Sequence, residues 1–288
     1  MLPQSLKTAC YQLLVKTDIF LLTRLFRVRL IWSVHNLITH DALQPEADIQ
    51  VSRFTARHAH QLIAHGEEAK KQIAQTFACP EDKIAIIPHG NYLQNYPNII
   101  SANEARQKLC ISDKKKVYLF IGGISQYKGV SDLIKAFISF SQEDDLLLIA
   151  GHCKDEALKE EICRLSQSST AIQLKLEFIP DYELQTYFNA ADWVILPFKK
   201  NLTSGSLILA MGFKKGLIVS DSGLNKEYTH AAGTIYISEP VSPESIQIAL
   251  VKSRQIDSVE AGMKNLDKVQ QFDWTEIAKK TITTYSVI

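Results

Sequence analysis

The sequence lacks cysteines in any ordered arrangement. Its 288 residues include five cysteines, and no two form a C-x-x-C pair: Cys10, Cys79, Cys110, Cys153 and Cys163. An odd, unclustered set argues against a disulfide framework and against a zinc site, and it is typical of a reducing compartment. We therefore expect a cytoplasmic protein that holds no metal ion.

An excess of charge of either sign is also missing. The 32 Lys and Arg residues nearly balance the 31 Asp and Glu residues, which gives a formal net charge of +1. A chain this close to neutrality has no global field that would recruit nucleic acid, so we expect no such partner. With 46% hydrophobic and 22% charged residues, the composition is ordinary for a globular protein.

No apolar run is long and clean enough to cross a membrane. The stretch from Tyr11 to Trp32 is rich in Leu, Ile, Phe and Val, but charged residues interrupt it at Lys16, Asp18, Arg24, Arg27 and Arg29. A spanning helix needs about 18 or more apolar residues with few charges, and the stretch does not fit a cleavable signal peptide. We expect a buried helix. The alternative is a basic amphipathic helix on an anionic membrane, which would place the protein at the membrane's inner face.

Strand-like and helix-like segments alternate along the chain, which predicts an α/β fold with parallel sheets. The pattern is fullest between residues 113 and 265, where we expect one doubly wound domain. Its expected strands are 116–121, 146–150, 172–178, 193–197, 217–220 and 234–237, and its expected helices are 131–140, 157–166, 182–190 and 206–213.

The first part of the chain is thinner. Residues 1–95 offer three strand candidates, at 29–34, 48–51 and 84–88, with helices from about Arg53 and at 66–76. This is little for a complete doubly wound domain. We therefore predict a partial N-terminal domain over 1–95, a linker with a short helix, the domain at 113–265, and a C-terminal crossover helix within 266–288.

Two segments of the larger domain could bind phosphate. Gly122 and Gly123 end a strand, and Lys128 precedes a helix, so the backbone can approach a ligand and a lysine can supply a point charge. The spacing is neither G-x-G-x-x-G nor a Walker loop, and a tight turn with a surface lysine is an equal reading. Ser204, Gly205 and Ser206 open a helix, where unsatisfied backbone N–H groups would meet a diphosphate; a plain N-cap role for a serine is compatible with this.

Further candidates follow other strands. In the segment 221–227, Asp221 could accept hydrogen bonds from a sugar hydroxyl, and the alternative is a surface loop. His35 ends the first expected strand, and the pair His40-Asp41 follows it. An imidazole near a carboxylate suits acid–base work or the positioning of a hydroxyl, whereas a lone histidine at a strand end is more often structural. His89 is a candidate for a cleft between the two halves.

Six segments, taken in order, resemble GT-B glycosyltransferases of the family 4 type: Ile31–Leu37, Pro88–Tyr92, Phe120–Gly129, Phe178–Pro197, Leu202–Ser206 and Phe272–Trp274. The resemblance implies two Rossmann-like doubly wound domains, of which the N-terminal one is incomplete because the family's glycine-rich opening strand and loop are missing. In three places the sequence departs from the family: Gly123 replaces an arginine, and Asn201 and Leu209 replace the paired glutamates of E-x7-E.

The resemblance also implies a site and a set of partners. A nucleotide diphosphate-sugar would be the donor, no other cofactor would be needed, and no metal would be required because side chains and helix dipoles stabilise the leaving diphosphate. His35 would be the catalytic residue, facing the sugar. The donor would be bound at its phosphates by Gly122, Gly123, Lys128, Ser204, Gly205 and Ser206, at the base by Phe178, Ile179 and Pro180, and at the ribose by Glu227.

The function we expect is that of a hexosyltransferase in polysaccharide biosynthesis, which moves a hexose to a glycan or lipid-linked acceptor. One alternative is a non-catalytic donor-binding or partner subunit, a truncated or decayed paralog of a split glycosyltransferase with a complementary subunit. Another is a phosphate-binding domain of a different α/β enzyme, such as a sugar epimerase. Fold membership does not decide between them.

Overall fold

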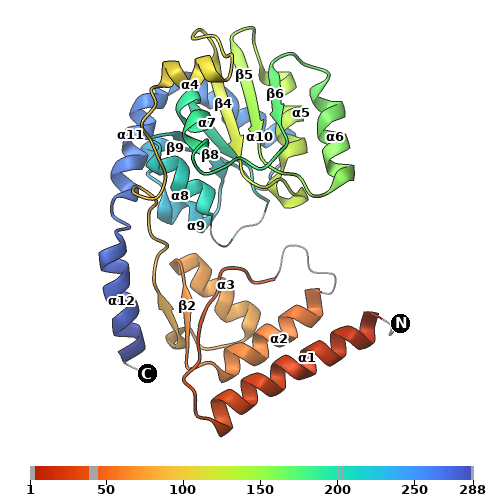
Figure 1. Ribbon diagram of the computed structural model, residues 1–288, viewed down its shortest axis with the longest axis vertical. Coiled ribbons are helices and arrows are strands. Elements are labelled where there is room, and N and C mark those ends of the chain that lie inside the picture. The colour runs from red at the N-terminus through yellow and green to blue at the C-terminus, as the bar shows by residue number, and fades with distance from the viewer. Residues whose placement is uncertain (1–3, 39–44, 200–201, 203, 287–288) are drawn as a thin grey trace. The chain divides into compact units, whose positions relative to one another are not determined.

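The computed structural model describes residues 4–38, 45–199, 202 and 204–286. The chain divides into two compact units (Figure 1). Unit 1 comprises Met1–Gly90 together with Asp273–Ile288, and unit 2 comprises Asn91–Phe272. The C-terminal segment therefore belongs to the same unit as the N-terminal part of the chain.

Unit 2 is built on a six-stranded parallel sheet with the order β6-β5-β4-β7-β8-β9. Its strands form where apolar runs are long enough to be buried on both faces; every residue of β5, β7 and β8 is buried. The strand bounds are β4 Lys116–Ile121, β5 Asp145–Ala150, β6 Ile172–Lys175, β7 Trp193–Leu196, β8 Gly216–Ser220 and β9 Thr234–Ile237. The six strands expected from the sequence are thus confirmed, with β6 ending three residues early.

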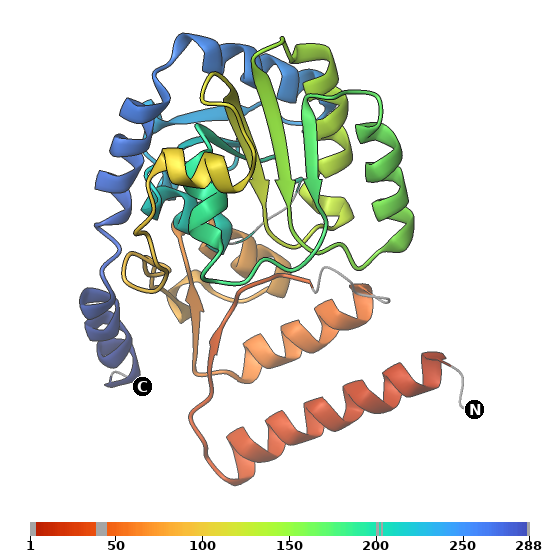
Figure 2. The same cartoon turned by 45° about the horizontal axis from the view of Figure 1, so that its top comes forward.

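Helices cover both faces of this sheet (Figure 2). Helix α5 packs against α6 and α10, while α4 packs against α7 and α8 packs against α11. Polar caps fix several helix starts; Ser101, for example, forms a capping box with Glu104. The helix bounds are α4 Ala102–Lys108, α5 Val130–Phe140, α6 Glu156–Ser166, α7 Leu184–Ala190, α8 Gly205–Gly212, α9 Gly223–Tyr228, α10 Pro243–Lys252 and α11 Ser258–Val269.

Unit 1 contains a three-stranded parallel sheet with the order β1-β2-β3. Ile63 and Ile87 form its small buried core with Ile277 of the C-terminal helix, and Ile31 packs against them. This contact explains why the C-terminal helix belongs to unit 1. The bounds are α1 Gln4–Phe20, β1 Ile31–Ser33, α2 Pro45–His58, β2 Gln61–Ala64, α3 Glu67–Phe77, β3 Ile84–Ile86 and α12 Trp274–Ser286.

The prediction of a strand at 48–51 is wrong, because these residues lie inside helix α2. Pro45 occupies the first position of the helix, and Glu46 and Asp48 place negative charge in its first turn, where it interacts favourably with the helix dipole. The second strand is instead β2, whose last three residues are buried. The short helix α9 is a second correction, since the segment 221–227 had no expected helix.

The buried helix expected near the N-terminus is also wrong. Helix α1 packs against α2, where the Gln12 side-chain amide donates a hydrogen bond of 2.9 Å to the Ala47 carbonyl. Its opposite side is open, and Leu13 is 68% exposed. Within the described part of the chain, no helix has both the length and the apolar character needed to cross a membrane.

Candidate functional site

The order in which the chain adds strands to the sheet of unit 2 reverses at β4. From β4 the chain runs outward through β5 and β6, and it then returns to β7 on the other side of β4. In open doubly wound sheets, ligands bind outside the carboxyl ends of the strands at this switch point. Residues 122–129 follow β4 and are called the β4 loop; the described residues between β7 and α8 are 197–199, 202 and 204, and they are called the β7 loop. The Lys199 backbone N–H donates a 2.8 Å hydrogen bond to the Tyr127 carbonyl and so ties the two loops together.

Three of the predicted phosphate-binding residues converge at this point. Gly122 has a φ of +133°, and a Cβ atom added to it would lie 3.2 Å from Ser206 Oγ and 3.7 Å from Lys128 Nζ. The hydroxyl and the ammonium group therefore flank the same half-buried backbone position, although Lys128 lies in the β4 loop and Ser206 lies in the first turn of α8. A Cβ atom on Gly123 would meet no atom within 4 Å, so this position faces open space.

Lys128 is held in a setting that disfavours its charge. Its side chain is half-buried, and burial lowers the pKa of the ammonium group. Its Nζ atom lies 5.2 Å from the centre of the Phe198 ring. Among the residues that the structure describes, no carboxylate forms an ion pair with it. An anion placed beside Lys128 would supply the missing counter-charge.

The start of α8 supplies the second part of the site. Ser204 Oγ accepts a hydrogen bond of 3.2 Å from the Leu207 N–H, so Ser204 is the N-cap of this helix. Gly205 and Ser206 are the next residues, and their N–H groups lie in the turn where a helix has no acceptors of its own. A Cβ atom on Gly205 would lie 3.3 Å from Tyr92 Oη. Tyr92 is not among the predicted site residues, although it ends one of the six resembling segments.

Two glycines allow the backbone to pack closely at the β4 loop. Gly151 follows β5 with a φ of +148°, and a Cβ atom there would lie 1.9 Å from the Gly122 carbonyl oxygen. Gly129 has a φ of +70°, and its Cβ atom would lie 2.5 Å from the Pro197 carbonyl oxygen. Both close approaches involve backbone atoms, so a side chain could be accommodated only by moving the loops.

We expect Gly151→Ala to lower the free energy of unfolding by about 2 kcal/mol, because the new methyl group meets backbone and φ is unfavourable. The measurement is urea denaturation of the whole chain. Gly123→Ala is the matched control, since it adds the same methyl group to a neighbouring loop position that faces open space. Equal losses in the two variants would contradict the proposed packing of Gly151 under Gly122.

The predicted nucleotide-binding residues lie at the same edge of the sheet as Gly122, because all six strands are parallel. Phe178 is 72% exposed and Ile179 is buried, both just after β6, with Pro180 following. Glu227 is half-buried on α9, after β8. Their contacts with a base and a ribose stay predictions. Asp221 forms an ion pair with Lys226.

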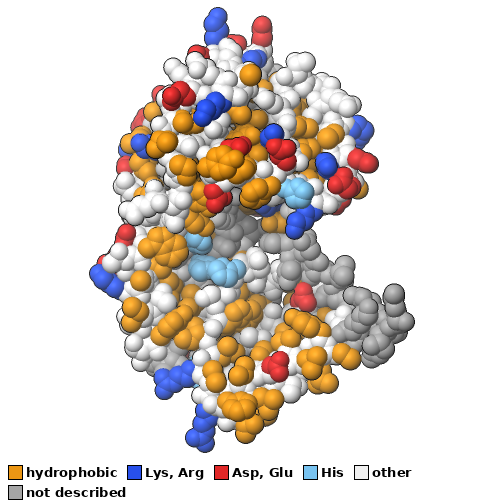
Figure 3. Space-filling view, viewed as in Figure 1, with side chains coloured by type: hydrophobic (Ala, Val, Ile, Leu, Met, Phe, Trp, Pro, Cys, Tyr) orange, Lys and Arg blue, Asp and Glu red, His pale blue; other side chains and the backbone are white. Residues whose placement is uncertain are grey.

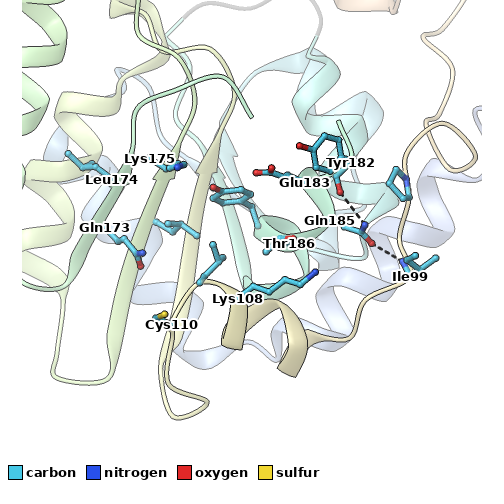
Figure 4. A pocket seen from close by; sticks show the side chains of 14 residues that line it. Ile99, Lys108, Cys110, Gln173, Leu174, Lys175, Tyr182, Glu183, Gln185 and Thr186 are labelled. Carbon is cyan, nitrogen blue, oxygen red and sulfur yellow. Dashed lines mark hydrogen bonds between the residues drawn. The ribbon is translucent and has the colours of Figure 1, made fainter. Parts of the chain in front are cut away.

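One pocket of unit 2 lies away from these residues. It measures about 900 Å³ and lies over β5 and β6, beside α4 and α7 (Figure 4). Gln185 lines this pocket; its side chain accepts a hydrogen bond of 2.9 Å from the Ile99 N–H and donates one of 3.1 Å to the Tyr182 carbonyl. None of the predicted site residues lines this pocket. This pocket is therefore not the predicted donor site, and the assignment of that site to Gly122, Lys128 and Ser206 stays a prediction.

Three histidines lie where the three parallel strands of unit 1 end. His35 follows β1, His65 follows β2 and His89 follows β3. His65 Nε2 lies 3.2 Å from His35 Nδ1, and His65 Nδ1 lies 2.9 Å from the Ile87 carbonyl oxygen. Burial lowers the pKa of His65, and the neighbouring His35 and His89 lower it further. His65 is not among the predicted site residues, because the strand before it, β2, is not predicted from the sequence either.

The remaining candidates divide in two. Leu209 lies on α8, while Asn201, His40 and Asp41 fall outside the described residues. His89 Nδ1 contacts the Gly90 carbonyl oxygen at 2.8 Å, and the His89 ring lies 6.1 Å from that of Trp274. Over the residues that the structure does describe, no group of three or more His, Cys, Asp or Glu side chains is arranged to hold a metal ion.

Comparison with known proteins gives one family match. The family model described as "Glycosyl transferases group 1" matches residues 101–254. An uncharacterized glycosyltransferase of Methanocaldococcus jannaschii, MJ1607, is 24% identical over 236 residues, which cover 79% of this chain and 60% of that protein. Alpha-maltose-1-phosphate synthase of Mycolicibacterium smegmatis is 21% identical over 287 residues, covering 89% of this chain and 74% of that protein. The chain thus spans about 60% of the length of the first of these relatives.

Solved structures extend the likeness beyond the matched segment. Alr3699/HepE of Anabaena, in complex with UDP and glucose, matches with a TM-score of 0.78 at 16% identity. The match covers 96% of this chain and 76% of the Alr3699/HepE chain. Sucrose-phosphate synthase of Thermosynechococcus elongatus also has a TM-score of 0.78, at 17% identity, covering 94% of this chain and 71% of its own. At these identities the likeness shows the fold.

Proposed function

This chain belongs to the group 1 glycosyltransferases and has their GT-B fold, and on that premise we propose that it transfers a hexose from a nucleotide diphosphate-sugar to a glycan or lipid-linked acceptor. The observation that carries the proposal is the convergence of Gly122, Lys128 and Ser206 at the switch point of the sheet. The bound UDP of Alr3699/HepE supports a nucleotide-sugar as donor for a protein of this fold.

The chemistry asks for charge stabilisation at the donor. When the bond between the anomeric carbon and the diphosphate oxygen breaks, negative charge collects on the departing nucleoside diphosphate. The Lys128 ammonium group and the first N–H groups of α8 would stabilise that charge, as donors aimed at developing charge do in general. The acceptor hydroxyl forms the new bond to the anomeric carbon, and its proton passes to the departing diphosphate or to solvent. We assign to His35 a hydrogen bond with the transferred sugar.

A screen of donor hydrolysis and transfer tests the proposal. UDP-, GDP- and ADP-sugars are incubated with the whole chain, with and without glycan and lipid-linked acceptors, and release of the nucleoside diphosphate is measured. Turnover that is lost in Lys128→Ala is the expected result. No nucleotide affinity, together with no effect of Lys128→Ala on stability or binding, would overturn the assignment of the site.

A non-catalytic donor-binding subunit is the second candidate. The observation in its favour is that Gly123 and Leu209 occupy positions where the family that the sequence resembles has an arginine and a glutamate. Without that arginine, Lys128 is the cationic side chain that the β4 loop supplies. Calorimetry separates the candidates. Binding of a nucleotide-sugar without turnover, with every acceptor tried, supports the subunit; turnover rejects it.

We further propose that α1 and the segment after it contact an anionic membrane. Between residues 8 and 30 four basic side chains stand against one acidic side chain, and Arg24, Arg27 and Arg29 are exposed. Figure 3 shows apolar side chains at the surface along α1 and α2, in the lower part of the view. The exposed apolar residues of this stretch are Tyr11, Leu13, Leu14, Phe20, Leu21, Leu22, Leu25, Phe26 and Val28. This combination of exposed apolar and basic side chains is typical of helices that lie in a membrane interface.

Sedimentation with vesicles measures this contact. We expect the chain to bind vesicles that contain phosphatidylglycerol and to bind pure phosphatidylcholine weakly. Arg24→Gln should reduce binding about fivefold, because one basic residue near an anionic surface is worth about 1 kcal/mol, and Leu14→Ser should reduce it about tenfold. Val259→Ser, which removes a 73% exposed side chain from α11 of unit 2, is the control. Failure to bind either vesicle rejects the membrane and leaves a complementary subunit as the occupant of this face.

A further inference from the structure

His65 lies between the proposed catalytic histidine and the backbone. The residue is only 8% exposed, and both of its ring nitrogens lie close to polar atoms of neighbouring segments. Nδ1 lies 2.9 Å from the Ile87 carbonyl oxygen, and Nε2 lies 3.2 Å from His35 Nδ1. The imidazole thus bridges β3 and the end of β1 from its own place at the end of β2.

The first contact fixes the proton on His65. A carbonyl oxygen can only accept a hydrogen bond, so His65 Nδ1 must carry a hydrogen and donate it. Burial disfavours a second proton on this ring, as do the imidazoles of His35 and His89, whose ring centres lie 4.9 Å and 6.0 Å from that of His65. In the neutral ring, Nε2 then has a lone pair and can only accept.

The second contact passes this constraint to His35. Because His65 Nε2 accepts, His35 Nδ1 must donate, and a neutral His35 then carries its lone pair on Nε2. We propose that His65 is a positioning residue that holds His35 as the Nδ1–H tautomer, so that His35 Nε2 accepts a hydrogen bond from a hydroxyl of the bound sugar. The inference rests on the proposed function for the identity of that hydroxyl, but the tautomer itself follows from unit 1 alone.

The tautomer can be observed without any turnover. In the ¹⁵N-labelled full chain, a long-range ¹H–¹⁵N spectrum of the imidazoles separates protonated from unprotonated ring nitrogens, and the signals lost in His35→Gln identify His35. We expect His35 to have a protonated Nδ1 and an unprotonated Nε2, the reverse of the tautomer that an unconstrained histidine side chain favours. A His35 ring with its proton on Nε2 overturns the proposal.

Two substitutions at one position separate positioning from folding. In His65→Gln the amide group lies near the place of Nε2 and can still accept from His35. In His65→Asn the shorter side chain lies near the place of Nδ1 and can donate only to the Ile87 carbonyl. We expect His65→Gln to keep the tautomer of His35 and His65→Asn to lose it, with similar melting temperatures for the two variants. An unchanged His35 tautomer in His65→Asn overturns the proposal.

The same pair extends to activity. Where a transfer reaction is measured, His65→Asn should lower kcat roughly tenfold or more with little change in KM, since an acid–base or hydroxyl-positioning group acts mainly in the transition state. His65→Gln should restore most of kcat. Equal losses in the two variants would overturn the positioning role. A chain that shows the expected tautomers but no transfer with any donor would instead reject the proposed function and leave the hydrogen-bond chain standing.

Discussion

Replacing Lys128 with methionine should abolish the binding of nucleotide diphosphates while raising the free energy of unfolding of the unliganded protein. The ammonium group is half-buried beside the Phe198 ring, and burial lowers its pKa, so the free protein contains a charge that its surroundings disfavour. Methionine fills a similar volume without the charge. We expect a gain of about 1 kcal/mol in stability, as is common when a functional site is relieved of such a group, and a loss of about 100-fold or more in affinity.

Calorimetry with UDP and GDP measures the affinity, and urea denaturation without ligand measures the stability. Lys135→Met is the matched control, because Lys135 on α5 is 47% exposed and lies 3.9 Å from Glu161 in an ion pair at the surface. The control should change neither quantity appreciably. A Lys128→Met variant that is less stable and binds nucleotide normally would show that Lys128 is a structural residue.

The pH dependence has a defined sign. Because the pKa of Lys128 is lowered in the folded chain, the unfolded chain binds more protons between the folded pKa and the ordinary lysine value of 10.5. The free energy of unfolding contributed by this group therefore rises with pH through that window. Affinity for an anion should fall over the same window, since the charged form is the one that binds. Lys128→Met should remove both trends.

The sequence supports the prediction of unit 2 because its signals are local. A strand such as β4 is buried at five of its six positions, so a continuous apolar run suffices to find it. Gly122 and Lys128 also lie in one loop, six residues apart. Their prediction as phosphate-binding residues therefore does not depend on knowing which other segments lie nearby. Ser206 is different, because it lies beside Gly122 only if β7 is the neighbour of β4 in the sheet. The alternation of strands and helices does not give this strand order directly. It follows only if the domain is assumed to be doubly wound.

Unit 1 was harder to predict because its elements are short and only partly buried. The strand β2 has four residues, and its neighbours β1 and β3 have three each. An apolar run of this length does not distinguish a strand from part of a helix, which is how the segment 48–51 of α2 was mistaken for a strand. His65 was overlooked for the same reason. Its role becomes visible only when β1, β2 and β3 are paired and the histidines at their ends are brought together.

The exposure of α1 shows a second limit. An apolar stretch predicts burial only if something in the fold covers it, and the sequence does not say what that is. In the described part of unit 1, α1 packs along α2, and the apolar side chains on its other side remain open. The basic side chains that interrupt the stretch argue against a spanning helix, and they also distinguish an interfacial helix from a core helix. The expectation of a buried helix is therefore wrong, while the alternative of an amphipathic helix at a membrane surface matches the observed exposure.

Introducing an arginine at Gly123 should strengthen nucleotide binding. A Cβ atom at this position meets nothing within 4 Å, and the position follows Gly122, beside which Lys128 Nζ and Ser206 Oγ lie. The backbone at Gly123 is also not in the positive-φ region, unlike Gly122, Gly129 and Gly151. An arginine can therefore be added without moving the loop, and its planar guanidinium group can bind two phosphate oxygens at once.

We expect Gly123→Arg to tighten the binding of UDP or GDP about 10- to 100-fold at low salt, which corresponds to one charge-assisted hydrogen-bonding group. The gain should shrink as ionic strength rises, because the position is open to solvent. Gly123→Gln is the control for side-chain size and hydrogen bonding without charge, and Gly123→Ala is the control for loss of glycine. If the arginine variant binds no more tightly than the glutamine variant, the diphosphate does not lie at the end of β4, and the site built on Lys128 must be abandoned. If the variant binds tightly but still fails to transfer sugar, Gly123 is not what prevents turnover, and the leucine at 209 becomes the next substitution to test.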